Sequence, residues 1–131
     1  MPAWAGTFGA DLERYMVWFG MIVASTTATR KDELLAEAVT KLASRNAGIQ
    51  PEAALEVLRE RERLGTTALE GGVAIPHGRV AGLSGPIAVL ARSATGVEWG
   101  APDGVPSRLI FVLLTPAEQS GSHLKLLAEV S

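Results

Sequence analysis

The two histidines of this 131-residue chain are its only imidazoles, so any histidine chemistry must involve His77, His123 or both. His77 lies in the run GGVAIPHGR, directly after a short apolar stretch and between Pro76 and Gly78. Proline fixes its own φ and biases the residue before it toward extended backbone, and glycine leaves room beside the ring. The sequence therefore predicts an imidazole presented at the end of a strand, although a histidine there can also be no more than a polar terminus.

An arginine on a predicted helix adds an anion-binding group to this histidine. Ala54, Leu58 and Arg61 follow the i, i+4, i+7 spacing, which puts a guanidinium on or beside the stripe that packs against the domain. Arginine grips two oxygens of a phosphoryl group at once and keeps its charge at any relevant pH. The alternative is that Arg61 belongs to a solvated charge cluster in the run RERER.

His123 follows Ser122, a good N-cap, so we expect it in the first turn of a last helix. Backbone N–H groups and the positive end of the helix dipole gather there, which favours an anion and keeps the ring neutral. The alternative is an exposed histidine at the start of a helix.

Composition removes several other classes of function. The chain has no cysteine, which excludes disulfides, thiolate catalysis and the commoner structural zinc sites. It lacks a G-x-x-x-x-G-K-[ST] loop and a G-x-S-x-G elbow, and no third ligand accompanies the two histidines, so we expect neither a metal nor a cofactor. Twelve basic residues against 14 acidic ones give a net charge of -2, without a dense basic patch, which argues against nucleic acid as a partner.

The apolar pattern predicts helices and strands in alternation. We expect a strand over 21–24, a helix that starts from Thr29 as N-cap and stops at 46–48, and a second helix from Pro51 to Gly65. Further strands are predicted over 73–75, 87–91, 97–99 and 109–114, and the last helix begins near Ser122.

The runs over 87–91 and 109–114 are continuously apolar, which is typical of strands covered on both faces. Together with the helices they predict an α/β fold in which a small mixed sheet is sandwiched by α-helices. Length and the lack of a linker favour one domain over 1–131. The apolar segment 16–24 has roughly half of the about 20 residues that a membrane span needs, so no span is expected.

The stretch RERLGTTALEGGVAIPHGR, from Arg61 to Arg79, resembles the signature of the fructose/mannitol-type enzyme IIA family of the sugar phosphotransferase system, which includes the nitrogen-regulatory enzyme IIA proteins. Its features are an R-E pair on a helix, a Gly-Thr-Thr turn and a Gly-hydrophobic-Ala-hydrophobic-Pro-His strand end. The later runs APDGVPSRLIFVLLTP and SHLKLLAEV are also similar to the family, so the match extends from about Lys31 to the end of the chain.

The resemblance implies a cytoplasmic phosphotransferase domain in which His77 receives a phosphoryl group from phospho-HPr or its paralogue. Arg61 then corresponds to the motif arginine and His123 to the second active-site histidine, with Thr67 and Gly78 in the environment of the phosphate. Sugar-transporting members pass the group on to a IIB domain. Regulatory members instead use it to alter their binding to target proteins, and the sequence leaves both roles open.

Three expectations concern the surface and the ends of the chain. Leu69, Val80 and Leu83 are candidates for a partly apolar docking surface around the histidine. Residues 1–30 form an atypical, aromatic leader that includes the first strand, and the C-terminal helix is shorter than in the family. Both end features indicate that the chain can form a homo-oligomer.

Overall fold

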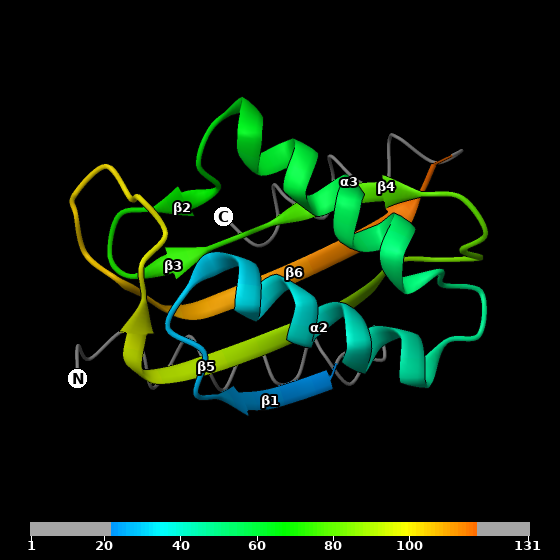
Figure 1. Cartoon of the computed structure of the whole chain (residues 1–131), viewed down its shortest axis with the longest axis horizontal. Coiled ribbons are helices and arrows are strands. Elements are labelled where there is room, and N and C mark those ends of the chain that lie inside the picture. The colour runs from blue at the N-terminus through cyan, green and yellow to red at the C-terminus, as the bar shows by residue number, and fades with distance from the viewer. Residues whose placement is uncertain (1–21, 118–131) are drawn as a thin grey trace.

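The computed structural model of the chain describes residues 22–117, which form two helices and a six-stranded sheet (Figure 1). In chain order the elements are β1 (Ile22–Thr26), α2 (Lys31–Arg45), α3 (Pro51–Leu64), β2 (Ala68–Leu69), β3 (Val73–Ala74), β4 (His77–Val80), β5 (Ile87–Val97) and β6 (Ser107–Pro116). None of the helices in this range is long and apolar enough to cross a membrane.

Helix α2 buries the five apolar side chains that recur at helical spacing, namely Leu34, Leu35, Ala38, Val39 and Leu42. It ends at Arg45, as predicted, but its N-cap is Arg30 and the prediction of Thr29 is wrong. The carbonyl of Thr29 accepts a hydrogen bond from the Glu98 N–H, and Arg30 forms a β-bridge with Glu98. Because these contacts keep the backbone extended through Arg30, the helix starts only afterwards.

Helix α3 has the predicted bounds, with Pro51 in its first turn and Gly65 as its C-cap. Proline fits the first turn because its missing N–H has no helical partner there. Gly65 has a φ of 153°, a conformation that glycine adopts readily, and its N–H donates to the Glu62 carbonyl. The fully buried side chains of α3 are Ala54 and Leu58.

The strands form one mixed sheet in the order β1-β5-β6-β3-β2, and β4 pairs with β6 as well. The pairs of β1 with β5 and of β3 and β4 with β6 are parallel, whereas β5 with β6 and β2 with β3 are antiparallel. Every residue of β6 from Leu109 to Pro116 is buried, which confirms that this strand is covered on both faces. The strand predicted over 97–99 is not separate, because β5 continues to Val97 after an irregularity that follows Arg92.

Strands β3 and β4 pair with β6 in a single register. Val73 lies opposite Leu109 and His77 lies opposite Leu113, so both pairs are offset by the same number of residues. The residues between the two strands stay at the sheet, since the carbonyl of Pro76 accepts a hydrogen bond from the Leu113 N–H. His77 is therefore held in the plane of the sheet rather than on a loop.

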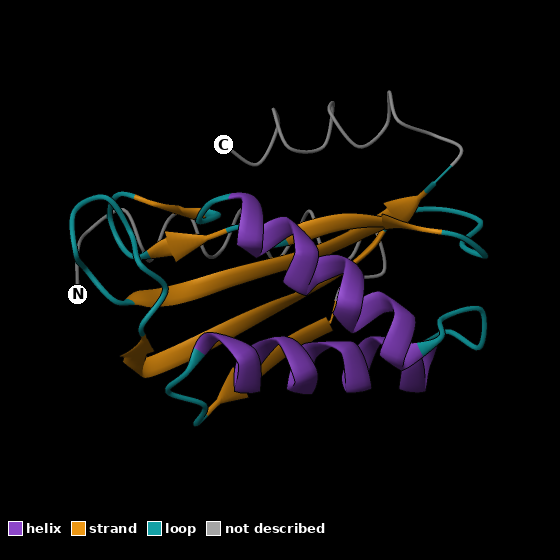
Figure 2. Cartoon of the chain, turned by 45° about the horizontal axis from the view of Figure 1, so that its top comes forward, coloured by secondary structure: helices purple, strands orange, loops and turns teal. Residues whose placement is uncertain are grey.

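Helices α2 and α3 pack side by side on one face of the sheet (Figure 2). The main hydrophobic core lies between them and the sheet, and includes Leu35, Leu58, Val89, Val112 and Trp99. A mixed sheet with packed helices confirms the predicted α/β class. The last predicted helix, from Ser122, lies outside the described residues.

Candidate functional site

The imidazole of His77 is half-buried at the start of β4. Its Nδ1 atom lies 2.7 Å from the carbonyl oxygen of Ile75. A carbonyl oxygen only accepts hydrogen bonds, so Nδ1 must carry the proton in this contact. In the neutral ring the lone pair then resides on Nε2, which makes Nε2 the nucleophilic atom.

The surroundings of His77 lower the pKa of its ring below the ordinary value of 6.5. Burial is the main cause, because it disfavours the charged imidazolium, and the positive charge of Arg61 acts in the same direction. The hydrogen bond to Ile75 and the negative charge of Glu62 oppose them. The net effect is a lowered pKa, which favours the neutral imidazole.

Arg61 lies in the last turn of α3, close enough for its charge to act on His77. Its Nη1 donates to the carbonyl of Gly65 at 3.0 Å, which holds the guanidinium over the end of the helix. The two groups that the sequence singled out on different elements are thus neighbours in the fold. A cation beside a neutral imidazole is suited to a group that brings negative charge to the ring.

Glu62, the residue after Arg61, was not singled out from the sequence, yet its side chain is only 6% exposed. Its Oε2 accepts hydrogen bonds from the Lys31 ammonium at 3.0 Å and from the Thr67 N–H at 3.4 Å, and its Oε1 accepts from the Thr67 hydroxyl. The signal that could have identified it is the spacing of Ala54, Leu58 and Glu62, which places Glu62 on the buried face of α3.

Thr67 is buried beside this carboxylate. Its hydroxyl donates to Glu62 and accepts a hydrogen bond from Trp99 Nε1 at 3.2 Å, and its carbonyl accepts one from the Ile75 N–H at 3.0 Å. Thr67 therefore joins α3 to the backbone that leads to His77. Its predicted place near a phosphate stays a prediction.

Gly78 allows α3 to approach β4. A Cβ atom at this position would collide with Cγ1 of Val57, and it would also contact Leu58. The glycine thus sets the distance between the helix that carries Arg61 and the strand that carries His77. This packing role explains the glycine in the motif, and its predicted place near a phosphate stays a prediction.

The remaining predicted residues divide into three groups. His123 lies outside the described residues. Val80 and Leu83 are 8% and 7% exposed and belong to the core, so the prediction that they line a docking surface is wrong. Their apolar character serves packing beneath the helices. Leu69 is 43% exposed and remains a candidate, and Leu64, next to Gly65, is 84% exposed.

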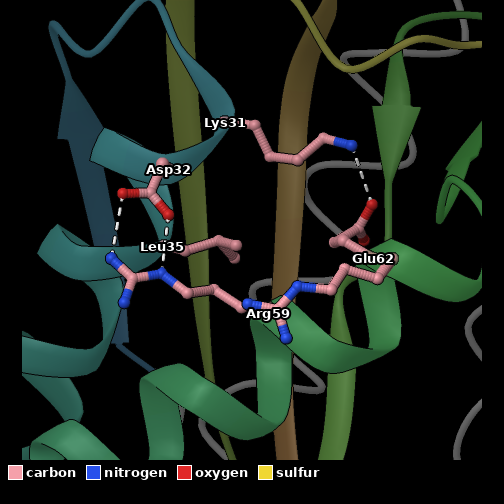
Figure 3. Close-up of a pocket in the computed structure, with 6 residues that line it drawn as sticks. Lys31, Asp32, Leu35, Arg59 and Glu62 are labelled. Atoms are coloured by element: carbon pink, nitrogen blue, oxygen red, sulfur yellow. Dashed lines mark hydrogen bonds and ion pairs between the residues drawn. The ribbon is translucent and has the colours of Figure 1, made fainter.

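A surface depression lies between α2 and α3 and has a volume of about 500 Å³ (Figure 3). It is lined by Lys31, Asp32, Leu35, Arg59, Glu62 and Arg63. Two ion pairs cross it. Arg59 forms a bidentate contact with Asp32 at 2.8 and 3.0 Å, and Lys31 binds Glu62. His77 is not among the lining residues, so this depression is separate from the histidine.

Comparison with known proteins assigns the chain to a family. Residues 20–131 match the family model described as the phosphoenolpyruvate-dependent sugar phosphotransferase system, EIIA 2. The nitrogen regulatory protein of Bradyrhizobium diazoefficiens is 37% identical over 110 residues, which are 84% of this chain and 71% of that protein. The fructose-specific EIIA component of Haloferax volcanii is 40% identical over 80 residues, and the alignment covers 61% of this chain and about half of that protein.

A solved structure supports the same assignment. The crystal structure of the nitrogen regulatory protein IIA-Ntr from Neisseria meningitidis superimposes with a TM-score of 0.75 at 40% sequence identity. The superposition covers 82% of this chain and 73% of that structure. The predicted resemblance is thereby confirmed at the level of both sequence and fold.

Proposed function

The chain belongs to the EIIA 2 family of the phosphoenolpyruvate-dependent sugar phosphotransferase system, and we propose from this premise that it is a cytoplasmic phosphoryl carrier that uses His77. It accepts the phosphoryl group from phospho-HPr or its paralogue and passes it to a IIB component during sugar uptake. The observation that carries the proposal is the setting of the ring: Nδ1 of His77 lies 2.7 Å from the carbonyl oxygen of Ile75, and burial together with the nearby charge of Arg61 lowers the pKa of the ring.

The transfer needs no proton to move. The lone pair of Nε2 attacks phosphorus, the bond from phosphorus to the donor atom of phospho-HPr breaks, and the electron pair of that bond stays on the donor. The phosphorylated ring keeps its Nδ1 proton and gains a positive charge, which the Ile75 carbonyl stabilises across 2.7 Å. Attack by an acceptor atom of the IIB component on phosphorus returns the electron pair to Nε2.

Catalysis then consists of alignment and charge stabilisation. Arg61 is the group that we assign to the phosphoryl oxygens, since its guanidinium can contact two of them at once. His123 is proposed as a second ring at the phosphate, as the resemblance implies. Thr67 and Gly78 support the site from inside the fold, through the contacts described above.

A regulatory role is the second candidate, and the relatives named nitrogen regulatory protein favour it. In that role the phosphorylation state of His77 changes the binding of the chain to target proteins. The chemistry at His77 is the same in both roles. They differ in whether the phosphoryl group leaves for a IIB component.

The test of the carrier function is to incubate the chain with phosphoenolpyruvate, enzyme I and HPr. We expect a phosphoryl adduct that is labile in acid and stable in base, formed by the unmodified chain and absent from His77→Ala. Equal labelling of both proteins would reject His77 as the acceptor. Omitting HPr provides the control for direct transfer from enzyme I.

A second step separates the two roles. The labelled chain is isolated and mixed with a fructose-type IIB domain, and the loss of label from the chain is followed in time. Rapid movement of the label to the IIB domain supports the transport role. Retention of the label supports the regulatory role.

A further inference from the structure

The carboxylate of Glu62 is buried, where a charge is costly. Its side chain is 6% exposed, and the three groups that donate to it are the Lys31 ammonium, the Thr67 hydroxyl and the Thr67 N–H. Removing a carboxylate from water is costly, and a buried ion pair often adds little net stability. Its contacts are consistent with a role in orientation rather than in stability.

The contacts of Glu62 lead to the histidine in three steps. Both oxygens of the carboxylate hold Thr67, and the carbonyl of Thr67 accepts the Ile75 N–H at 3.0 Å. The carbonyl of Ile75 in turn accepts the Nδ1 proton of His77 at 2.7 Å. Each step joins a different part of the fold: helix α3, the segment before β2, and the connection from β3 to β4.

Trp99 closes this chain of contacts from the other side. Its indole N–H donates to the Thr67 hydroxyl at 3.2 Å, and its carbonyl accepts the Thr66 hydroxyl at 3.0 Å. The indole is 1% exposed, and the Lys31 ammonium lies 5.5 Å from the centre of the ring. The Thr67 hydroxyl is thus held by one donor, the Trp99 indole N–H, and by one acceptor, the Glu62 carboxylate. Packing fixes the positions of both.

We propose that Glu62 is a positioning residue for His77, which acts through Thr67 and Ile75 to keep the ring proton on Nδ1 and the lone pair on Nε2. This inference rests on the proposed function, because the tautomer matters only if Nε2 is the atom that attacks phosphorus. Glu62 does not touch the reacting atoms. Its effect is to fix the carbonyl that selects the tautomer.

Glutamine can keep only part of the contacts that the carboxylate makes. Its amide has one accepting oxygen, whereas Glu62 uses both oxygens to accept from Thr67 and Lys31. An NH₂ group in place of Oε2 would face two donors, and an NH₂ group in place of Oε1 would leave the Thr67 hydroxyl without its acceptor. Glu62→Gln is therefore a change of nearly equal size that breaks the hydrogen bonds specifically.

The experiment measures the tautomer of His77 directly, in the full chain and without any phosphoryl donor. The ¹⁵N chemical shifts of the two ring nitrogens distinguish the Nδ1–H from the Nε2–H form, and His77→Ala assigns the signals. We expect the unmodified chain to be mainly Nδ1–H. In Glu62→Gln and Thr67→Val the ratio should move toward Nε2–H by about two- to tenfold, as expected for the loss of one hydrogen bond.

Two matched variants serve as controls. Asp32→Asn breaks the other ion pair between α2 and α3, which is exposed, and should leave the tautomer unchanged. Thr67→Ser keeps the hydroxyl and should restore the ratio that Thr67→Val loses. If Glu62→Gln does not fold, the comparison of Thr67→Val with Thr67→Ser shows whether the contacts of the Thr67 hydroxyl set the tautomer of His77.

The outcomes separate this inference from the proposed function. Folded Glu62→Gln and Thr67→Val proteins with an unchanged tautomer ratio would overturn the positioning role, even if His77 is phosphorylated. A shifted ratio together with no phosphorylation of His77 would reject the carrier function and leave the positioning role intact. If Glu62 positions the ring and His77 is the phosphoryl acceptor, the transfer rate from phospho-HPr should fall in Glu62→Gln. The concentration of phospho-HPr at half-saturation should stay the same.

Discussion

His77 and Ile75 are joined by a hydrogen bond from the ring to the backbone, in which Nδ1 lies 2.7 Å from the carbonyl oxygen two residues earlier. The ring orientation is thus tied to the same backbone that pairs with β6. If the side chain rotated so that this contact broke, the half-buried Nδ1–H group would lose its hydrogen-bond partner. The tautomer and the direction of Nε2 follow from the strand rather than from the solvent.

The first prediction concerns pH. Because the pKa of His77 is lowered from 6.5, mainly by burial, the rate of phosphoryl acceptance should be level above that pKa and fall below it, where the ring loses its lone pair to a proton. Between the lowered pKa and 6.5 the unfolded chain binds more protons than the folded one. The free energy of unfolding should therefore decrease as the pH falls through this window.

An NMR titration of the His77 ring checks this prediction. A measured pKa at or above 6.5 would contradict it. The same titration on Arg61→Ala should give a higher pKa than in the unmodified chain, because a positive charge that disfavours the imidazolium has been removed.

The second prediction compares two arginines of α3. Arg61→Ala should fold and should lower the transfer rate from phospho-HPr by about 10²- to 10³-fold, as expected for the loss of one charged donor at the phosphoryl group. Arg63→Ala should transfer at the normal rate, since Arg63 is exposed and pairs with Glu56 and Glu60. Equal rates in the two variants would remove Arg61 from the site.

The third prediction tests the close approach of α3 to β4. Gly78→Ala should lower the free energy of unfolding by about 1–3 kcal/mol, because the added Cβ meets Val57. Gly85→Ala is the control, since a Cβ there meets no atom within 4 Å. Chemical unfolding measures both.

The contact itself can be isolated with Val57→Ala. In the double variant Gly78→Ala/Val57→Ala the losses should not add, and the coupling should be about 0.5–3 kcal/mol. Additive losses would show that Gly78 matters for its own backbone and not for the space it leaves to the helix.

The fourth prediction concerns Asp103, whose carboxylate accepts the N–H groups of Gly71 at 2.9 Å and of Val105 at 3.1 Å. These bonds hold the pKa of Asp103 below 3.8, so their stabilisation is present above that value and is lost as the pH falls through the lowered pKa. Asp103→Ala should melt at a lower temperature than the unmodified chain at pH 7. Below the lowered pKa of Asp103 the two melting temperatures should converge, and a gap that stays constant with pH would contradict the prediction.

The elements that the sequence predicted well are those with strong local signals. Pro51 and Gly65 bound α3 as expected, because each favours its position through its own backbone. Strands β5 and β6 were recognised from their continuous apolar runs. Strand β3 was predicted over 73–75 and is observed at Val73–Ala74. Strand β2 was not predicted, because it has two residues and its pairing with β3 is a contact between strands that its own residues do not signal.

The site was predicted only in part, for a related reason. His77 and Arg61 are recognisable from residue type and spacing, and the fold brings them together. Glu62 lies in the run RERER, for which the alternative interpretation was a solvated charge cluster, and its spacing of four residues from Leu58, which indicates a buried position, was overlooked. Its burial depends on Thr67 and on Lys31, which come from other elements.

The shared register of β3 and β4 on β6 has a consequence for the carrier cycle. Since the backbone on either side of the histidine is bound to the same strand, residues 73–80 contain no hinge that a phosphoryl group on the ring could move. The phosphorylated and the unphosphorylated protein should then have almost the same shape. Partner proteins would have to tell them apart by electrostatic potential, and the ionic strength of the medium should set how sharply they do so.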